Sequence, residues 1–187
     1  MSTFKNMTHK TNFKLVIPDM GAVDFEASLQ GVSIPGLEIE PTQISVNQQT
    51  MGNLPGSAVR FEPLNVRILL DEDLSGYIDI YKWMLSIVDY AGNKSTAQDP
   101  GTAPKNVLLH VLDNSKSSIL LTWKFYGAWP TTLGNIDFEY TDESNTAMTT
   151  DVVFMYKSFE IEKNGIIIRP KESGSGSGIK GMHPSFN

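Results

Sequence analysis

The side chains that could carry out chemistry are few and scattered along the chain. The three histidines, His9, His110 and His183, fall in separate segments, and the sequence has no cysteine. Zinc sites need Cys or His ligands at short regular spacings, such as two histidines four residues apart on a helix. Neither that spacing, nor a P-loop, nor the nucleophile motif of the hydrolases occurs. The sequence therefore predicts no catalytic residue, no metal site and no cofactor.

The densest group of potential metal ligands is the acidic run Asp71, Glu72 and Asp73. A calcium loop would also need a glycine and a distant glutamate at set positions, and these are absent. The run directly precedes a segment with helical spacing. Carboxylates at a helix start accept unpaired backbone N–H groups and face the positive end of the helix dipole. We therefore interpret these residues as helix-capping residues.

Length and charge set limits on the class of protein. The 187 residues suit one domain, and 40% hydrophobic with 19% charged residues is typical of a globular protein. The net charge of −6 argues against a protein that grips nucleic acid through its phosphates. The N-terminus lacks the apolar core of a signal peptide, and no run approaches the ~20 apolar residues of a membrane span. We expect an intracellular protein without a membrane partner.

Most of the chain has the alternating apolar pattern of β-strands. A long loop over about 47–56 is expected to project as a hairpin tip, because it has no apolar period and contains Gly, Pro and Asn. The strand that follows it changes phase at Glu62-Pro63, which indicates a bulge. The expected strands are 13–17, 23–30 as its hairpin partner, 37–46, 57–70, 107–112, 119–125, 136–140, 151–161 and 166–168.

A single helix is predicted at about 74–89. Its apolar residues recur every three or four positions and would share one face, which we expect to be buried: Leu74, Ile78, Tyr81, Leu85 and Val88. One helix cannot form a bundle, so it must cover a sheet. The predicted fold is mainly β (α+β), an antiparallel β-sandwich or barrel flanked by one α-helix.

The predicted domain has an extension at each end. Residues 1–12 are polar and are expected to form a flexible arm, and residues 13–170 form the β domain. Residues 171–187 form a flexible Gly/Ser-rich tail that ends in a short apolar segment. The tail is interpreted either as disordered chain, as a peptide that docks on a neighbour, or as a linker derived from cloning.

An ordered series of segments resembles one known family. The series is IPGLEIE, LPGSAVRFEPLNVRILLDEDL, YIDIYKWM, LLTWKFYGAWPTTLGNIDFEY and TTDVVFMYKSFEI. In this order it resembles the tail tube proteins of contractile-tailed, myovirus-like bacteriophages, over about residues 13–162. The individual motifs are short, and the order carries the resemblance.

The resemblance implies a structural virion protein and not an enzyme. Hexameric rings would stack into the hollow tail tube, inside a contractile sheath, through which DNA is ejected without being bound specifically. The implied partners are further copies of the chain, the tail sheath protein, and baseplate and tube-terminator proteins, and the location is the virion tail after assembly in the host cytoplasm. The projecting tip would contact the adjacent ring through Gln48, Gln49, Thr50, Met51, Gly52, Asn53 and Leu54.

The acidic balance acquires a role in such a tube. Asp24, Glu26, Asp137 and Glu139 alternate with apolar residues in two predicted strands. If they line the bore, they would repel DNA phosphates and keep the passing DNA from adhering. If they face outward, they only solvate the outer wall, and the pattern leaves both arrangements open.

Related assemblies offer alternatives to the major tube subunit. The chain could be a tube initiator or baseplate ring protein, although such proteins are often longer. It could also be the tube subunit of a contractile injection or secretion system, which uses the same architecture. An enzyme or small-ligand barrel is the least favoured class.

Overall fold

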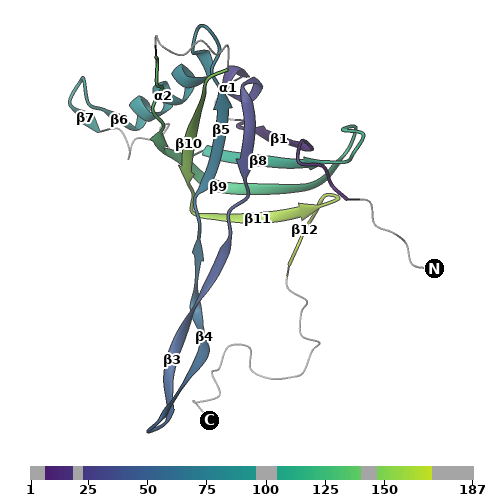
Figure 1. Ribbon diagram of the computed structural model, residues 1–187, viewed down its shortest axis with the longest axis vertical. Coiled ribbons are helices and arrows are strands. Elements are labelled where there is room, and N and C mark those ends of the chain that lie inside the picture. The colour runs from purple at the N-terminus through teal and green to yellow at the C-terminus, as the bar shows by residue number, and fades with distance from the viewer. Residues whose placement is uncertain (1–6, 19–22, 96–104, 140–146, 170–187) are drawn as a thin grey trace.

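The computed structural model describes residues 7–18, 23–95, 105–139 and 147–169 (Figure 1). Within these ranges the sheets are antiparallel, as predicted. The elements are, in order, β1 (Phe13–Val16), α1 (Val23–Ala27), β2 (Leu29–Ser33), β3 (Leu37–Asn47), β4 (Thr50–Phe61), β5 (Leu64–Leu69), α2 (Ser75–Ile87), β6 (Val88–Asp89), β7 (Lys94–Ser95), β8 (Lys105–Leu112), β9 (Ile119–Leu133), β10 (Thr149–Met155), β11 (Ser158–Lys163) and β12 (Ile166–Ile167).

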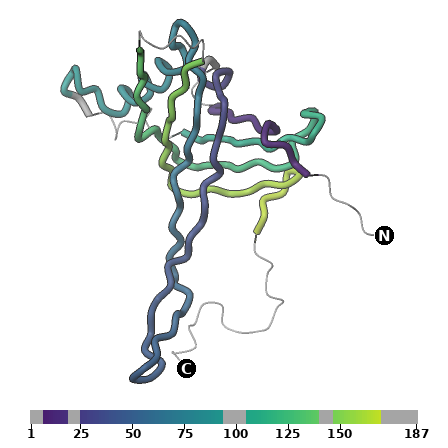
Figure 2. The backbone as a smooth tube through the Cα atoms, viewed as in Figure 1, coloured from purple at the N-terminus to yellow at the C-terminus, as the bar shows by residue number. Residues whose placement is uncertain are grey.

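The body of the protein is one bent sheet in the order β1-β8-β9-β10-β5-β2, with β11 also paired to β9. Strand β9 makes the bend, because its first half pairs with β8 and β11 and its last residues, Trp129–Leu133, pair with β10. Gly127 lies at the bend with a φ of 62°, a conformation that glycine adopts without steric cost. The two parts of the sheet run across each other and form two layers (Figure 2).

The core lies between the two layers and under α2. In β5 the side chains of Leu64, Val66 and Ile68 are fully buried and the intervening residues are exposed, as the alternating pattern predicts. The Phe154 ring in β10 contacts Phe25 edge to face, and it also contacts Trp83 of α2. These contacts join α1, α2 and the sheet into one core.

Strands β3 and β4 pair with each other and stand away from the body (Figure 1). We call this hairpin, residues 37–61, the ribbon. The segment 47–56 projects from the body, but the predicted loop conformation is wrong. All of it except the turn at Gln48-Gln49 is strand. The predicted single strand over 57–70 with a bulge at Glu62-Pro63 is also wrong, because the chain breaks there into two strands: β4 ends at Phe61, and β5 begins at Leu64 in a different sheet.

The predicted strand over 23–30 is wrong in its first half, which forms the short helix α1. Strand β1 pairs with β8 and not with the following segment. Without a strand partner, the backbone groups of this segment form hydrogen bonds within a helical turn. Neighbouring side chains of α1 still face different surroundings. Phe25 is buried in the core, whereas the Glu26 carboxylate accepts the backbone N–H of Ile17 at 2.7 Å.

Helix α2 is confirmed, but the predicted buried face is wrong. The buried residues of α2 are Gly76, Ile80 and Trp83. On the face predicted to be buried, the side chains of Ile78 and Tyr81 are 39% and 38% exposed. The helix is apolar on both sides, so its period alone could not select the face on the sheet. Of the three predicted capping residues, Asp71 has a carboxylate that accepts the Ser75 N–H at 2.9 Å. The N-cap residue itself is Leu74, and the first turn contains no acidic residue, so the predicted place of Glu72 and Asp73 in the cap is wrong.

Three further predictions differ in the structure. The segment 136–139 is not a strand, and the predicted strand 151–161 is divided into β10 and β11, which lie in different layers. The predicted flexible N-terminal arm is fixed at its end, because Asn12 is buried and its side-chain amide donates a hydrogen bond to the Asn114 side chain.

The predicted turn at Asn164-Gly165 is confirmed, with φ values of 51° and 79°. The tail 171–187 lies outside the described residues.

Candidate assembly surfaces

The outer half of the ribbon, residues 41–55, has one apolar and one polar face. Ile44, Val46 and Leu54 lie on the same face, with exposed fractions of 38%, 63% and 50%. Val46 packs over Gly52, because a Cβ on that glycine would lie 2.8 Å from the valine methyl. The opposite face carries mainly the polar side chains of Gln43, Ser45 and Asn53, together with Met51 and two prolines.

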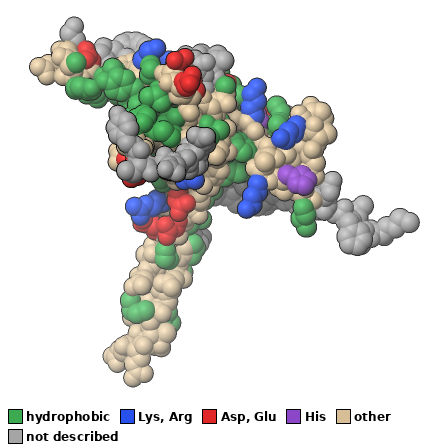
Figure 3. All heavy atoms as spheres, turned by 45° about the horizontal axis from the view of Figure 1, so that its top comes forward, with side chains coloured by type: hydrophobic (Ala, Val, Ile, Leu, Met, Phe, Trp, Pro, Cys, Tyr) green, Lys and Arg blue, Asp and Glu red, His purple; other side chains and the backbone are tan. Residues whose placement is uncertain are grey.

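The ribbon is also uncharged everywhere except at its base. No Asp, Glu, Lys or Arg occurs from residue 41 to residue 59. The charges begin at the base, where Arg60 pairs with Glu40 at 3.4 Å. Figure 3 shows a group of acidic and basic side chains where the ribbon joins the body and no charged side chain on the visible face of the rest of the ribbon. A neutral ribbon suits a neutral partner surface, since burying an unpaired charge is costly.

All seven residues predicted to contact an adjacent ring lie in the outer half of the ribbon. Gln48 and Gln49 form its turn, where Gln49 donates its N–H to the Asn47 side chain at 2.9 Å, and Thr50–Leu54 belong to β4. The structure therefore brings them together on one projecting segment. Their contact with another ring stays a prediction.

The second surface is an apolar groove between the outer side of α2 and the end of β9. We call it the α2–β9 groove. It has a volume of about 630 Å³, and the hydroxyls of Tyr81 and Tyr90 are 2.7 Å apart beside it. Figure 3 shows hydrophobic side chains gathered at this end of the molecule, opposite the ribbon. The groove is lined mainly by Tyr77, Tyr81, Leu85, Val88, Trp129 and Leu133.

The groove was missed by sequence reasoning, although its signal is present. The helical spacing predicts Leu85 and Val88 on the core face of the helix, whereas both line the groove. The signal is that α2 has apolar residues on two sides, which is more than one sheet can cover. A helix of this kind predicts a second surface to be buried elsewhere.

The four predicted lumen residues do not lie on strands. Asp24 and Glu26 belong to α1, and the Glu26 carboxylate is bonded within the chain to Ile17 N–H. Asp137 and Glu139 are exposed in the segment after β9, which is not part of a ladder. The strand alternation on which the lumen assignment was based is therefore wrong. A place in a bore stays a prediction for all four.

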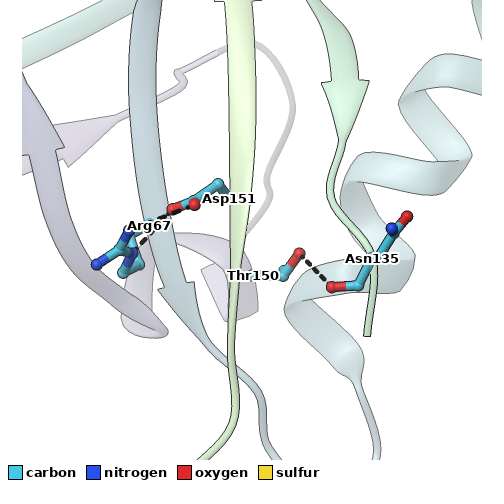
Figure 4. A network of polar contacts seen from close by, with 4 residues as sticks. All are labelled: Arg67, Asn135, Thr150 and Asp151. Atoms are coloured by element: carbon cyan, nitrogen blue, oxygen red, sulfur yellow. Dashed lines mark hydrogen bonds and ion pairs between the residues drawn. The ribbon is translucent and has the colours of Figure 1, made fainter. Parts of the chain in front are cut away.

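An ion pair that the sequence did not reveal lies on the outer face of the sheet. Arg67 of β5 faces Asp151 of β10, and their closest atoms, Nε and Oδ1, are 2.8 Å apart. The guanidinium holds the pKa of Asp151 below its usual range. Figure 4 shows the pair on one side of β10, while Thr150 points to the other side and donates to the Asn135 carbonyl at 3.3 Å. The ion pair links β5 to β10 on this face of the sheet.

Within the described ranges, no three His, Asp or Glu side chains lie close enough together to hold a metal ion. His110 is half-buried against Thr122 Oγ1 at 2.9 Å, and burial lowers its pKa. No described helix is long and apolar enough to cross a membrane. The surfaces that stand out are the ribbon and the groove, which suit assembly.

The sequence profile of the T4-like virus tail tube protein gp19 family matches residues 9–160. The chain belongs to this family. It is 35% identical over 166 residues to the tail tube terminator protein of Enterobacteria phage T4, covering 87% of this chain and 93% of that protein. The tail tube family is structural and non-enzymatic, and its members are components of the phage tail in the virion. This confirms the predicted resemblance.

Solved structures of tube-forming assemblies share the fold of this tail tube family protein. The sheath-tube complex of the PVC system has a TM-score of 0.62 at 16% identity, covering 85% of this chain and 93% of that chain. The PVC sheath/tube terminator has a TM-score of 0.61 at 15% identity, with coverages of 84% and 98%. The tube terminating cap of the anti-feeding prophage has a TM-score of 0.58 at 14% identity, with coverages of 86% and 93%. The predicted mainly β fold class is thereby confirmed.

Proposed function

We propose that this protein forms the ring that ends a phage tail tube. The observation that carries the proposal is the 35% identity to the T4 tail tube terminator protein, which extends over 93% of that protein. Such a protein has to bind the last ring of a tube and add no further ring. It therefore needs a surface for the tube and surfaces for its own neighbours.

The ribbon supports a role in assembly. An isolated two-stranded hairpin is at best marginally stable in water. Here its apolar residues stay exposed, including Val46 at 63% and Leu54 at 50%. Several exposed apolar side chains on one projecting element indicate a surface that is buried in an assembly. A ring of such subunits would carry one ribbon per subunit toward the same end.

The ring is proposed to be hexameric and hollow, with DNA passing through it without specific binding. Its net charge of −6 per chain disfavours adhesion of phosphates. The proposed partners are the tail tube and the sheath, because similar folds occur in a sheath-tube complex and in a sheath/tube terminator. Head-to-tail contacts between identical subunits close into a ring when their rotation returns to the start.

The repeating tube subunit is the second candidate. The description of the matched family, a tail tube protein, favours it. A repeating subunit differs from a terminator in one measurable property, because it adds to itself without limit whereas a terminator stops after one ring. Both candidates use the same fold and the same ribbon.

Electron microscopy of the purified protein, alone and with growing tail tubes, separates the candidates. We expect isolated rings from the protein alone, and one ring at the end of each tube with a shorter mean tube length in the mixture. Long tubes from the protein alone would overturn the proposal in favour of the repeating subunit. Tubes that start from its rings and grow longer would overturn it in favour of an initiator.

A further inference from the structure

The α2–β9 groove leaves large apolar side chains exposed to water. Val88 and Tyr90 at its edge are 51% and 65% exposed, and Tyr81 on the outer side of α2 is 38% exposed. The groove has a volume of about 630 Å³, within the range of roughly 300–1,000 Å³ that ligand pockets occupy. Exposed apolar surface in a hollow of this size indicates that another segment of protein covers it.

The chain itself contains a segment with the composition of an occupant. Residues 179–187 read IKGMHPSFN, with the apolar side chains of Met182 and Phe186 and a single charged side chain, that of Lys180. Residues 173–178, which precede them, alternate Ser and Gly, as is typical of a flexible linker. A short apolar segment at the end of such a linker is suited to bind a groove on the same molecule.

The charges of the segment and of the groove are opposite in sign. The range 71–95, which contains α2 and one side of the groove, has five acidic and two basic residues. One of the acidic residues, Asp89, lies between the groove residues Val88 and Tyr90. The positive charge of Lys180 is therefore attracted to this edge, in addition to the gain from burying apolar area.

The last described residues direct the chain toward the groove. Strand β12 runs back along β11, where the Ile168 N–H donates to the Ile161 carbonyl at 2.8 Å and Arg169 pairs with Glu160 at 2.7 Å (Figure 1). Strand β11 pairs in turn with β9, with Glu160 opposite Lys124. The chain therefore leaves β12 in the direction of the bend in β9, and the residues of β9 beyond that bend line the groove.

The remaining distance is within reach of the tail. Trp129 is five residues along β9 from Lys124, roughly 17 Å at ~3.3 Å per residue, and two strand spacings of about 4.8 Å separate β12 from β9. The gap is therefore about 20 Å. A Gly-rich chain of n residues spans about 5–6 Å × √n on average, so the 12 residues 170–181 span ~19 Å. The tail can therefore bring Met182 to the groove of its own chain.

We propose that the C-terminal segment 179–187 folds back past the bend of β9 and fills the α2–β9 groove of its own chain. Met182 and Phe186 are the side chains that enter the groove. Because a short flexible linker gives an effective concentration of the order of millimolar, even a weak contact is populated. The groove is then closed to any other protein until the segment is displaced. This contact goes beyond the proposed function and does not depend on ring formation.

Disulfide formation within one chain tests the contact, because the natural chain has no cysteine. The full-length variant Val88→Cys/Ser185→Cys places one thiol at the edge of the groove and the other next to Phe186. Val88 is exposed, so its replacement should leave the body folded. A disulfide forms only when the two Cα atoms come within about 7 Å. The dilute protein is oxidised, and the looped chain is measured by its faster migration in a non-reducing denaturing gel.

The matched control is Ile119→Cys/Ser185→Cys. Ile119 is 51% exposed, as Val88 is, and it lies five residues along β9 from Lys124 in the direction away from the groove. A tail that does not dock reaches Ile119 at least as easily as it reaches Val88. We expect looping to Val88 to be at least about tenfold faster, which corresponds to ~1.4 kcal/mol in the population of the contact. Equal rates, or slow looping at both positions, would overturn the proposal.

Two further measurements test the apolar basis of the contact and the chain that supplies it. Adding Met182→Ser and Phe186→Ser to the Val88/Ser185 variant should slow looping to the rate of the control, and an unchanged rate would overturn the apolar contact. Mixing Val88→Cys protein with Ser185→Cys protein should give few linked dimers. Dimers that form as fast as the loop would overturn the assignment to the same chain, in favour of a neighbouring subunit.

Discussion

At the scale of single residues, Tyr156 joins the core to the base of the ribbon. Its hydroxyl donates to the Glu62 carbonyl at 2.6 Å, next to the junction of β4 and β5. Its ring contacts the rings of Phe61, Phe125 and Phe159. Burial raises the pKa of Tyr156 to about 12, because the charged phenolate is poorly solvated there.

Tyr156→Phe should lower the free energy of unfolding by about 1 kcal/mol at neutral pH, since the Glu62 carbonyl loses its donor. The pH dependence should also change. Between the unfolded pKa of 10.0 and the folded pKa of about 12, the unfolded state releases this proton and the folded state keeps it. Tyr156 therefore contributes stability that is complete below pH 10 and is lost as the pH rises toward 12.

Urea unfolding at neutral pH and through the alkaline range would measure both effects. The difference in stability between the wild-type protein and Tyr156→Phe should shrink as the pH rises. A difference that stays constant through this range would show that the hydroxyl titrates as an exposed tyrosine does, and the prediction would then be wrong.

At the scale of elements, α2 has a buried side and an outer side that the same type of residue can probe. Ile80 is fully buried, whereas Ile78 is 39% exposed two residues away. Ile80→Asp should lower the free energy of unfolding by roughly 3 kcal/mol or more, because a carboxylate enters the core without a partner. Ile78→Asp should lower it by about 0.5 kcal/mol. Thermal unfolding of both variants by circular dichroism measures the difference, and equal losses would contradict the assigned faces.

Gly56 is required where the strands of the ribbon approach closely. A Cβ at this position would overlap the backbone carbonyl oxygen of Glu40, next to the shift of register between Ile39 and Pro41. Gly56→Ala should therefore distort the ribbon and leave the body folded. Hydrogen exchange at ribbon amides should become at least about tenfold faster.

Ser57→Ala is the matched control for Gly56→Ala, because Ser57 is the adjacent exposed residue of β4. It should leave the exchange rates of the ribbon unchanged. Equal rates in the two variants would show that the close approach at Glu40 has no effect on the ribbon.

Elements also differ in how far their own sequence determines their conformation. The strand β5 was predictable, because it is buried on one face only and its residues Leu64, Val66 and Ile68 alternate with exposed ones. The segment Val23–Ala27 alternates equally well, yet it is helical. Its conformation depends on which strand pairs with β1, and that partner, β8, is about 90 residues away. Local pattern does not contain such long-range information.

The candidate assembly surfaces were predictable in part for a related reason. The projecting segment is visible in the sequence, because it lacks both charge and apolar period from 47 to 56. Its strand conformation comes from pairing along its whole length with β3. The sequence does not indicate a strand there, because Gly and Pro residues are unfavourable in strands. The groove was hidden because Leu85 and Val88 have the spacing of a core face.

At the scale of the whole molecule, the ribbon and the body should be separable. The ribbon makes its strand pairs within itself, and the core residues of the body lie outside its outer half. Replacing residues 42–55 with a two-residue Asn-Gly turn should shift the thermal midpoint by less than about 5 °C and abolish assembly. Calorimetry and sedimentation measure the two results. Rings of normal size from the shortened protein would contradict the role of the ribbon.

The order of strands in the sheet also has a consequence for synthesis on the ribosome. The two neighbours of β5 are β2, made before it, and β10, which follows some 80 residues later. The central strand of that layer therefore waits with an open edge until nearly the whole domain has left the exit tunnel. At about 5–20 residues per second, this delay lasts for several seconds. The nascent chain is most vulnerable to aggregation during that interval, whereas the ribbon, whose strands are adjacent in sequence, can pair earlier.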